Sequence, residues 1–273
     1  MNVTEYTLKG CNLIRTDLLS LSSLSLISSP KDIYTIKLTR FNNFFSVLKN
    51  DTLFYFVKNN SITDDEFKIN EDVVVDPAGL TYILNNNING AGGGSGEIYN
   101  FLNLKSFDKN IINFFESKDI EEDENEKLYI KNNELKTDIS PSKAGLYKIK
   151  DSKINIIHTV GPNFTNSRVL NNILNDDNES KLNELIYKIY ESIFKEFVSL
   201  KDHKKLYLRL LPVSTGIYLP SKNKEVNLKK ILNAIKIALF KLLNKSEYQH
   251  LIEKVSLYLY EQSEYREYKS LFE

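Results

Sequence analysis

The residues best suited to binding chemistry are the glycines of the sequence NGAGGGSGEIY, at positions 89–99. Five of the seven residues from 90 to 96 are glycine, so the backbone there can take positive φ angles and approach a ligand closely. An apolar strand pattern, VVV at 73–75, precedes the glycines, and an amphipathic pattern, IYNFLNL at 98–104, follows them. A helix starting there would direct unpaired N–H groups and its positive dipole end at an anion. The pattern favours a diphosphate cradle; it lacks the Lys-Ser/Thr pair of a P-loop, and a flexible turn is the alternative.

A second candidate loop is LLPVSTGIYLP, at positions 210–220, which continues another apolar strand pattern. Gly216 again permits close approach of the backbone to a ligand, and Ser214 and Thr215 offer hydroxyl groups. A helical pattern begins farther along the chain. The alternative is therefore a strand-to-helix connection that binds nothing.

A third segment, INIIHTVGPNF at 154–164, contains a strongly apolar strand pattern with a histidine inside it. A histidine in such a place is more often a hydrogen-bonded core residue than a functional group. We therefore predict a structural role for His158. Gly161 and Pro162 then end the strand.

The elements that would hold these loops alternate between strands and helices. Continuous apolar runs predict strands at 53–57, 73–75, 154–160, 206–213 and 255–260. Apolar residues at helical spacing predict helices through Leu182, Leu185, Ile186, Ile189, Ile193, Phe194 and Phe197, and through Ile231, Leu232, Ile235, Ala238, Leu239 and Leu242. This alternation predicts an α/β fold, with a mixed, mainly parallel sheet between two helical layers. Ligands of such folds bind beyond the carboxyl ends of the strands.

Two segments carry no visible chemistry. Residues 1–50 are interpreted as an N-terminal extension with a plausible strand, DIYTIKLTRF at 32–41, and residues 51–273 as the main domain. The charge-rich stretch near 117–137 is interpreted as a solvated acidic insertion loop.

Composition narrows the function classes. Lys+Arg and Asp+Glu are equal at 36 each, which argues against a generic nucleic-acid binder. The single cysteine, Cys11, and three scattered histidines form no metal-ligand pattern, so we expect neither a metal nor a cofactor. The apolar run from Leu18 to Ile27 is interrupted by serines and too short to cross a bilayer. We therefore expect a protein of the cytoplasm or nucleus with no membrane segment.

Taken together, these segments resemble the macrodomain family. The pattern VVVDPAG…GAGGGSGEIY looks like the family's strand, Asn-Ala-Ala-Asn turn and glycine-rich loop. IIHTVGP is similar to its IHTVGP motif, LPVSTGIY to its second phosphate loop, and VSLYLYEQSEYREY to its last strand and closing helix. The resemblance covers roughly residues 50–273. It implies a three-layer α/β/α fold whose ligand is ADP-ribose or an ADP-ribosylated protein.

The resemblance also implies which residues would contact the ligand. Ile62, in a weak echo of the family's Asp-Ile pair, would lie near the adenine, and Tyr260 would stack on it. The diphosphate would lie between the two loops, and Tyr218 could cover the distal ribose. The full set of candidate ligand-binding residues is Ile62, Asp76, Ala78, Gly79, Gly92, Gly93, Gly94, Ser95, Gly96, Glu97, Ser214, Thr215, Gly216, Ile217, Tyr218 and Tyr260.

Departures from the family pattern leave catalysis open. Gly79 stands where the family's second asparagine holds the distal ribose, and Ser95 stands where hydrolytic members often carry an acid. Asp76 is the remaining candidate for a catalytic base or ribose ligand; the alternative is that it caps its own turn by accepting backbone N–H groups. The alternatives to an ADP-ribose reader are a hydrolase of ADP-ribosyl esters or of ADP-ribose 1″-phosphate, and a degenerate macrodomain that serves as an interaction scaffold.

Overall fold

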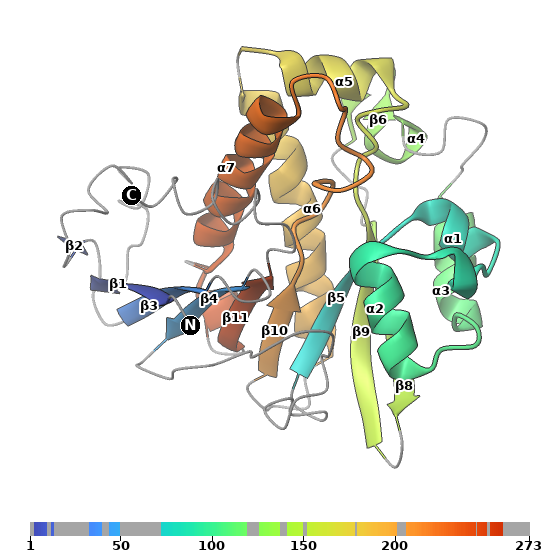
Figure 1. Cartoon of the computed structure of the whole chain (residues 1–273), viewed down its shortest axis with the longest axis horizontal. Helices are drawn as coiled ribbons and strands as arrows, with labels where there is room; N and C mark the ends of the chain where they lie inside the picture. Colours follow the sequence, from blue (N-terminus) through green and yellow to red (C-terminus); the bar gives the residue numbers. More distant parts are fainter. Residues whose placement is uncertain are drawn as a thin grey trace.

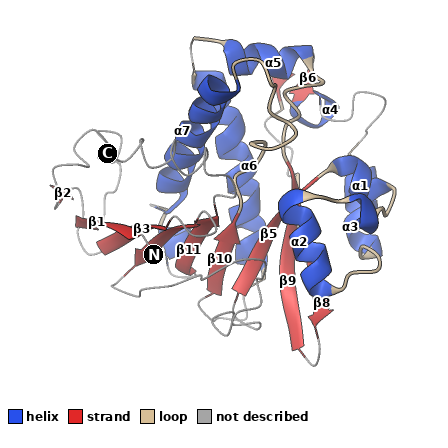
Figure 2. Cartoon of the chain, viewed as in Figure 1, coloured by secondary structure: helices blue, strands red, loops and turns tan. Residues whose placement is uncertain are grey.

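The computed structural model describes most of the chain from residue 72 onward and four short segments before it. The described residues are 3–9, 12–13, 33–39, 44–49, 72–118, 126–136, 141–149, 152–177, 179–200, 206–243, 245–249 and 252–258. The predicted strand at 53–57 and the apolar run from Leu18 to Ile27 lie outside them. The described residues form a mixed α/β fold, with helices packed on one large sheet (Figures 1 and 2).

Nine strands of the described chain form this sheet, which is parallel at its centre and antiparallel at its sides. Their bounds are β1 Val3–Lys9, β2 Asn12–Leu13, β3 Ile33–Thr39, β4 Phe44–Lys49, β5 Asp72–Ala78, β8 Ser142–Ile149, β9 Ser152–Val160, β10 Leu206–Leu210 and β11 Ile252–Tyr258. The four parallel strands lie in the order β11, β10, β5, β9, and β8 pairs antiparallel with β9 at one edge. The strands predicted at 73–75, 154–160, 206–213 and 255–260 are confirmed as β5, β9, β10 and β11, although β10 ends at Leu210 and the described part of β11 ends at Tyr258.

The N-terminal strands continue the same sheet on its other side. β4 pairs antiparallel with β11, and β3, β1 and β2 follow it. The strand predicted within 32–41 is confirmed as β3. Segments of residues 1–50 therefore extend the sheet that carries the rest of the fold, while the boundary drawn at residue 50 stays a prediction.

The helices lie on both faces of the sheet (Figures 1 and 2). The helices and the small hairpin are α1 Leu80–Leu84, η3 Ile88–Gly90, α2 Gly93–Leu102, α3 Lys109–Glu116, α4 Glu126–Tyr129, β6 Ile130–Lys131, β7 Glu134–Leu135, α5 Arg168–Asn175, α6 Ser180–Ser199, α7 Lys224–Leu243 and α8 Ser246–Gln249. In β9, His158 belongs to a polar cluster with Tyr99 of α2. The next residue, Thr159, accepts a hydrogen bond from Ser142, whose hydroxyl also bonds Ser192 of α6. Because consecutive strand residues point to opposite faces, α2 and α6 lie against opposite faces at β9.

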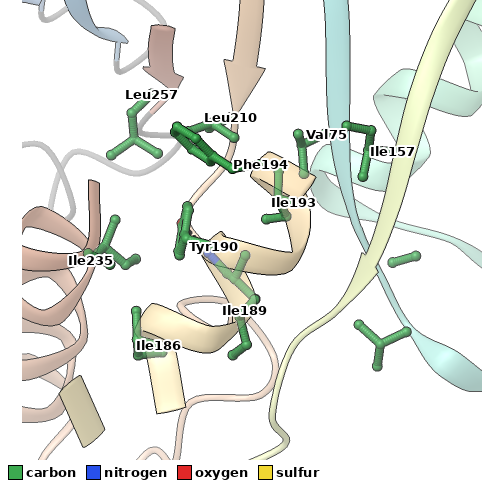
Figure 3. Close-up of a cluster of buried hydrophobic side chains, with 14 of the residues drawn as sticks. Val75, Ile157, Ile186, Ile189, Tyr190, Ile193, Phe194, Leu210, Ile235 and Leu257 are labelled. Carbon is green, nitrogen blue, oxygen red and sulfur yellow. Dashed lines mark hydrogen bonds between the residues drawn. The ribbon is translucent and has the colours of Figure 1, made fainter. Parts of the chain in front are cut away.

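The core forms where α6 meets the strands. Ile193 and Phe194 of α6 are fully buried beside Val75, Ile157 and Leu210 of three neighbouring strands (Figure 3). Each such side chain contributes about 1.5–3 kcal/mol when it leaves water. The two long amphipathic helices that the spacing predicted are confirmed as α6 and α7.

Part of the stretch predicted as a solvated loop near 117–137 is folded and buried. Residues 126–136 form α4 and the β6–β7 hairpin. Leu128, Tyr129 and Ile130 are 0%, 3% and 7% exposed, and the backbone N–H of Lys136 donates to the Tyr129 carbonyl at 2.7 Å. Three apolar side chains among the charges anchor this end of the insertion on the domain, because burying them outweighs the solvation of the charged neighbours.

Candidate functional site

The loops that leave β5 and β10 meet at the carboxyl ends of these adjacent strands, through contacts that only glycine permits. A methyl group on Gly94, in the first turn of α2, would lie 2.5 Å from Leu211 Cδ1. A methyl group on Gly79 would lie 3.2 Å from the Tyr218 hydroxyl and closer still to the Tyr82 ring. The glycine-rich segment and the loop after β10 are therefore held against each other, as a shared ligand site would require.

The loop after β9 is held against the same assembly. A side chain on Gly161 would collide with Val213 and with the Ser214 hydroxyl. Farther on, the Phe164 N–H donates to the Tyr218 carbonyl at 3.1 Å. The glycine and proline that were predicted to end β9 thus also support the loop after β10.

The N-terminus of α2 is open. Gly92 is its N-cap residue and supplies no side chain, and Gly93 follows with φ +56°, the left-handed region that favours glycine. The first turn closes through a hydrogen bond from the Gly96 N–H to the Gly92 carbonyl at 3.2 Å. Among the described residues, a methyl group on Gly92 or Gly93 would meet nothing within 4 Å. The first N–H groups of this ten-residue helix have no intrahelical partner, so they are available to an anion.

The loop after β10 contains a strained turn with an exposed tip. Ser214 takes φ +65°, a left-handed conformation that is unusual for a residue with a side chain. Its Oγ is buried and has no hydrogen-bond partner among the described residues, whereas the Thr215 hydroxyl donates to the Pro212 carbonyl at 3.4 Å. At the tip, a methyl group on Gly216 would meet nothing within 4 Å, and Ile217 is 80% exposed. Backbone strain of this kind is concentrated at binding and catalytic sites.

Asp76 is the centre of a buried polar cluster. Its carboxylate is 0% exposed and accepts hydrogen bonds from the Ser95 hydroxyl at 2.6 Å and the Tyr99 hydroxyl at 2.6 Å. His158 Nδ1 lies 2.8 Å from the same carboxylate, and its Nε2 lies 2.6 Å from the Tyr147 hydroxyl. A carboxylate can only accept, so the contact with Asp76 assigns a proton to His158 Nδ1, and Nε2 is then placed to accept the hydrogen bond that the Tyr147 hydroxyl donates. The cluster joins β5, β8, β9 and α2, and each of these side chains has a hydrogen-bond partner within it.

The electrostatics of the cluster keep its phenols neutral. Burial, and then the negative charge of Asp76, raise the pKa of Tyr99 far above its ordinary value. The same two causes, in the same order, raise the pKa of Tyr147. Both hydroxyls therefore remain hydrogen-bond donors at any physiological pH.

This arrangement changes the interpretation of Asp76 and Ser95. The alternative that Asp76 caps its own turn by accepting backbone N–H groups is wrong, because the partners of its carboxylate among the described residues are three side chains. The Ser95 hydroxyl is likewise directed into the cluster. The prediction that His158 is a hydrogen-bonded core residue is confirmed. Asp76 therefore faces protein groups, which removes the geometric support for its assignment as ribose ligand or base.

The asparagines at 85–87 are used in local folding. Asn87 Oδ1 accepts from the Gly90 N–H at 3.1 Å and caps the short helix η3. Asn86, at φ +50°, accepts from the Phe107 N–H at 2.8 Å through its Oδ1. The Oδ1 atoms of Asn86 and Asn87 therefore already have backbone partners within the fold.

Sequence reasoning missed Tyr129. This tyrosine of α4 is 3% exposed, and its buried hydroxyl has no hydrogen-bond partner within the described parts of the chain. Burial, followed by the nearby Tyr218 phenol, raises the pKa of Tyr129 well above its ordinary value. The apolar triplet LYI at 128–130 within a charged stretch was the signal that could have located it.

Of the remaining candidate residues, some are described by the structure and others are not. Ala78 is fully buried at the end of β5. A methyl group on Gly96 would collide with the Ala91 carbonyl, so this position requires glycine for packing. Ile62, Tyr260 and the Glu97 side chain lie outside the described parts of the chain.

Two further properties concern the described residues as a set. They contain no group of three or more His, Cys, Asp or Glu side chains placed to hold a metal ion. Among the same residues, no helix combines the length and apolar character that crossing a membrane requires.

Comparisons of the chain with models of protein families, with curated proteins and with solved structures found no match.

Proposed function

We propose that this chain is a macrodomain-like protein with a three-layer α/β/α fold that binds ADP-ribose, free or attached to a protein. The observation that carries the proposal is the pairing of two open loops on adjacent strand ends. One is the uncapped N-terminus of α2 at Gly92 and Gly93. The other is the strained turn from Ser214 to Gly216. Such a reader would act in the cytoplasm or nucleus.

A diphosphate suits both loops physically. The helix N-terminus offers N–H donors and a partial positive charge, and the opposite turn offers backbone N–H groups at the exposed Gly216 and Ile217. Hydrogen bonds to charged groups contribute about 1.5–3 kcal/mol each. A few of them, less the cost of ordering the ligand, are consistent with a dissociation constant of micromolar order, about −8 kcal/mol.

The geometry gives less support to the hydrolase and phosphatase alternatives. Ester cleavage at the anomeric carbon needs a positioned water and a base in reach of it. The Asp76 carboxylate is fully buried and engaged with three donors, and the Ser95 hydroxyl is one of them. Turnover of an aspartate- or glutamate-ADP-ribosylated protein is therefore expected to be slow or absent.

The proposal is tested by calorimetry of the whole chain with ADP-ribose, and with AMP as the control. ADP-ribose should bind with micromolar affinity, and AMP more weakly because it brings a single phosphate to a cradle built for two. An absence of heat at millimolar ADP-ribose would contradict the proposal and favour a scaffold that has lost its ligand. Rapid release of ADP-ribose from a modified protein would favour the hydrolase.

A further inference from the structure

Strand β8 lies at one edge of the sheet, and its outward backbone groups follow from its register. Among the described residues, β8 pairs only with β9 (Figure 1). The Val160 N–H donates to the Pro141 carbonyl at 3.3 Å, so that carbonyl points toward β9. The Ala144 N–H instead donates to Glu196 Oε2 at 3.0 Å, away from β9. Because the direction of these groups alternates along an antiparallel strand, the N–H and C=O of Leu146 also point outward.

The α6 face of the β8–β9 hairpin carries an exposed leucine. The Ser142 hydroxyl bonds Ser192 of α6, so alternate residues of β8, counted from Ser142, share the face that α6 covers. Leu146 is on this face and is 53% exposed, whereas Tyr147 on the opposite face is 7% exposed. An apolar side chain beside outward backbone groups is what a pairing strand would cover.

Two lysines oppose each other on the same face. Lys148 of β8 and Lys153 of β9 are cross-strand partners, and both are exposed. Their pair is of the non-hydrogen-bonded kind, like that of Ala144, in which opposite side chains lie closest. Like charges directly opposite each other destabilise a sheet. An anionic group bound beside these lysines would relieve a repulsion that the fold carries.

Lysines also lie along the edge itself. Lys143 Nζ lies 3.6 Å from Glu196 Oε2 of α6 and 5.8 Å from the ring centre of Phe114 in α3. Lys118, just after α3, lies with its Nζ 4.3 Å from the same ring centre. The Glu196 carboxylate thus contacts a lysine and an outward N–H of the edge at once. The protein itself places a carboxylate on this edge, which is the chemistry that an acidic chain would bring.

We propose that the β8 edge is a docking surface for an extended acidic segment of a partner protein, which adds a strand beside Leu146 and brings carboxylates to Lys148 and Lys153. The outward N–H and C=O groups pair with the backbone of the segment, and Leu146 contacts its apolar residues. The inference goes beyond the proposed function, because this surface and the candidate ligand site lie at opposite ends of β9. From Lys153 to Val160 the strand rises roughly 23 Å, at about 3.3 Å per residue.

The test uses the whole chain and a fluorescent peptide of alternating glutamate and valine, followed by anisotropy. One control peptide alternates lysine and valine, which reverses the charge. The other has the glutamate–valine sequence with N-methylated amides, which keeps the charge but cannot donate to a sheet. Wild type should bind the glutamate–valine peptide at least about tenfold more tightly than either control. Added salt should weaken this binding, because the charges involved are exposed.

Variants of the chain locate the binding. Lys148→Gln/Lys153→Gln should lose roughly three- to tenfold in affinity for the acidic peptide, and its melting temperature should be unchanged or higher because a like-charge pair is removed. The matched control is Lys188→Gln/Lys195→Gln, which removes the same charge from α6, where each lysine pairs with a glutamate. This control should bind as wild type does. Leu146→Pro should bind weakest, since it removes an outward N–H and no hydrogen bond to β9.

Three outcomes would overturn the inference. If millimolar glutamate–valine peptide does not bind wild type, the edge lysines only protect the sheet from pairing. If the N-methylated peptide binds equally well, or the two double variants lose affinity equally, the attraction is one of general charge. If wild type self-associates at rising concentration and Leu146→Pro does not, the occupant of the edge is a second copy of this chain and not an acidic segment.

Discussion

On the face of α2 that meets the sheet, every hydroxyl around Asp76 has a partner, whereas in the loop after β10 and in the insertion two buried hydroxyls have none. Ser95, Tyr99 and Tyr147 all donate within the first group. Ser214 and Tyr129 are equally buried, but among the described residues their hydroxyls have no partner. A satisfied network stabilises the folded state, while an unsatisfied group lowers stability and is retained where a ligand completes it. The contrast indicates that the first region stabilises the fold, whereas a binding role for the second region is part of the proposed function.

The largest effect should come from removing the centre of the satisfied region. Asp76→Ala leaves Ser95, Tyr99 and His158 without their common acceptor in the interior. Each buried donor left unsatisfied costs about 1–3 kcal/mol, and three lose their acceptor here, so we expect a large fall in the denaturant midpoint. Chemical unfolding followed by circular dichroism measures it. A fall of less than about 1 kcal/mol would show that the cluster is not a stabilising unit.

Removing a single donor from the same region should have an intermediate effect, and one that depends on pH. Tyr99→Phe should cost about 1–3 kcal/mol, since one carboxylate oxygen loses a short hydrogen bond. Burial and the charge of Asp76 raise the pKa of folded Tyr99 above its ordinary value of 10.0. The stability that Tyr99 contributes is therefore complete below pH 10 and is lost as the pH rises from there toward the folded pKa.

Unfolding curves measured between pH 8 and pH 11, roughly one to two units on either side of the ordinary value, check this dependence. Wild type should lose stability more steeply than Tyr99→Phe at the alkaline end. Parallel pH profiles for the two proteins would mean that the Tyr99 hydroxyl does not experience the Asp76 charge as inferred.

The smallest expected effect comes from the unpaired region. Ser214→Ala removes a buried hydroxyl without a partner among the described residues, so stability should be unchanged or somewhat higher. ADP-ribose affinity should fall by roughly three- to tenfold, the loss of one hydrogen bond to a charged or polar ligand group. The matched control is Ser142→Ala, whose hydroxyl bonds Thr159 and Ser192. Ser142→Ala should lower stability and leave ADP-ribose affinity unchanged. If Ser214→Ala lowered stability and Ser142→Ala lowered affinity, the roles inferred for the two regions would be wrong.

The sequence predicted the elements with long, regular patterns and the position of the loops between them. Continuous apolar runs located β5, β9, β10 and β11, and helical spacing located α6 and α7. The prediction that glycines let a ligand approach the backbone stays a prediction, although side chains of the protein pack closely on Gly79, Gly94 and Gly161. These features depend on residues near one another in the chain, which is why periodicity and turn chemistry report them.

The partners of buried polar groups could not be predicted in the same way. Asp76 meets Ser95, Tyr99 and His158, which lie 19, 23 and 82 positions away. No local pattern encodes such pairings, so an aspartate at a strand end was interpreted as a ligand or a turn cap. The burial of Tyr129 was hidden for a related reason, because the charges around it dominate the composition of the insertion.

The central claim, that the turn from Ser214 to Gly216 cradles a diphosphate, is tested most directly at Gly216. This glycine has an ordinary φ and open space around it, so a longer side chain strains nothing; Gly93 is less suitable, because its φ of +56° would strain any replacement. Calorimetry with ADP-ribose should compare wild type, Gly216→Gln and Gly216→Glu, with melting temperatures measured alongside. All three should melt alike, Gln should bind with modest loss, and Glu should lose at least a hundredfold, about 2.7 kcal/mol, because its carboxylate repels the diphosphate. A Gly216→Glu variant that binds ADP-ribose as wild type does would contradict the account.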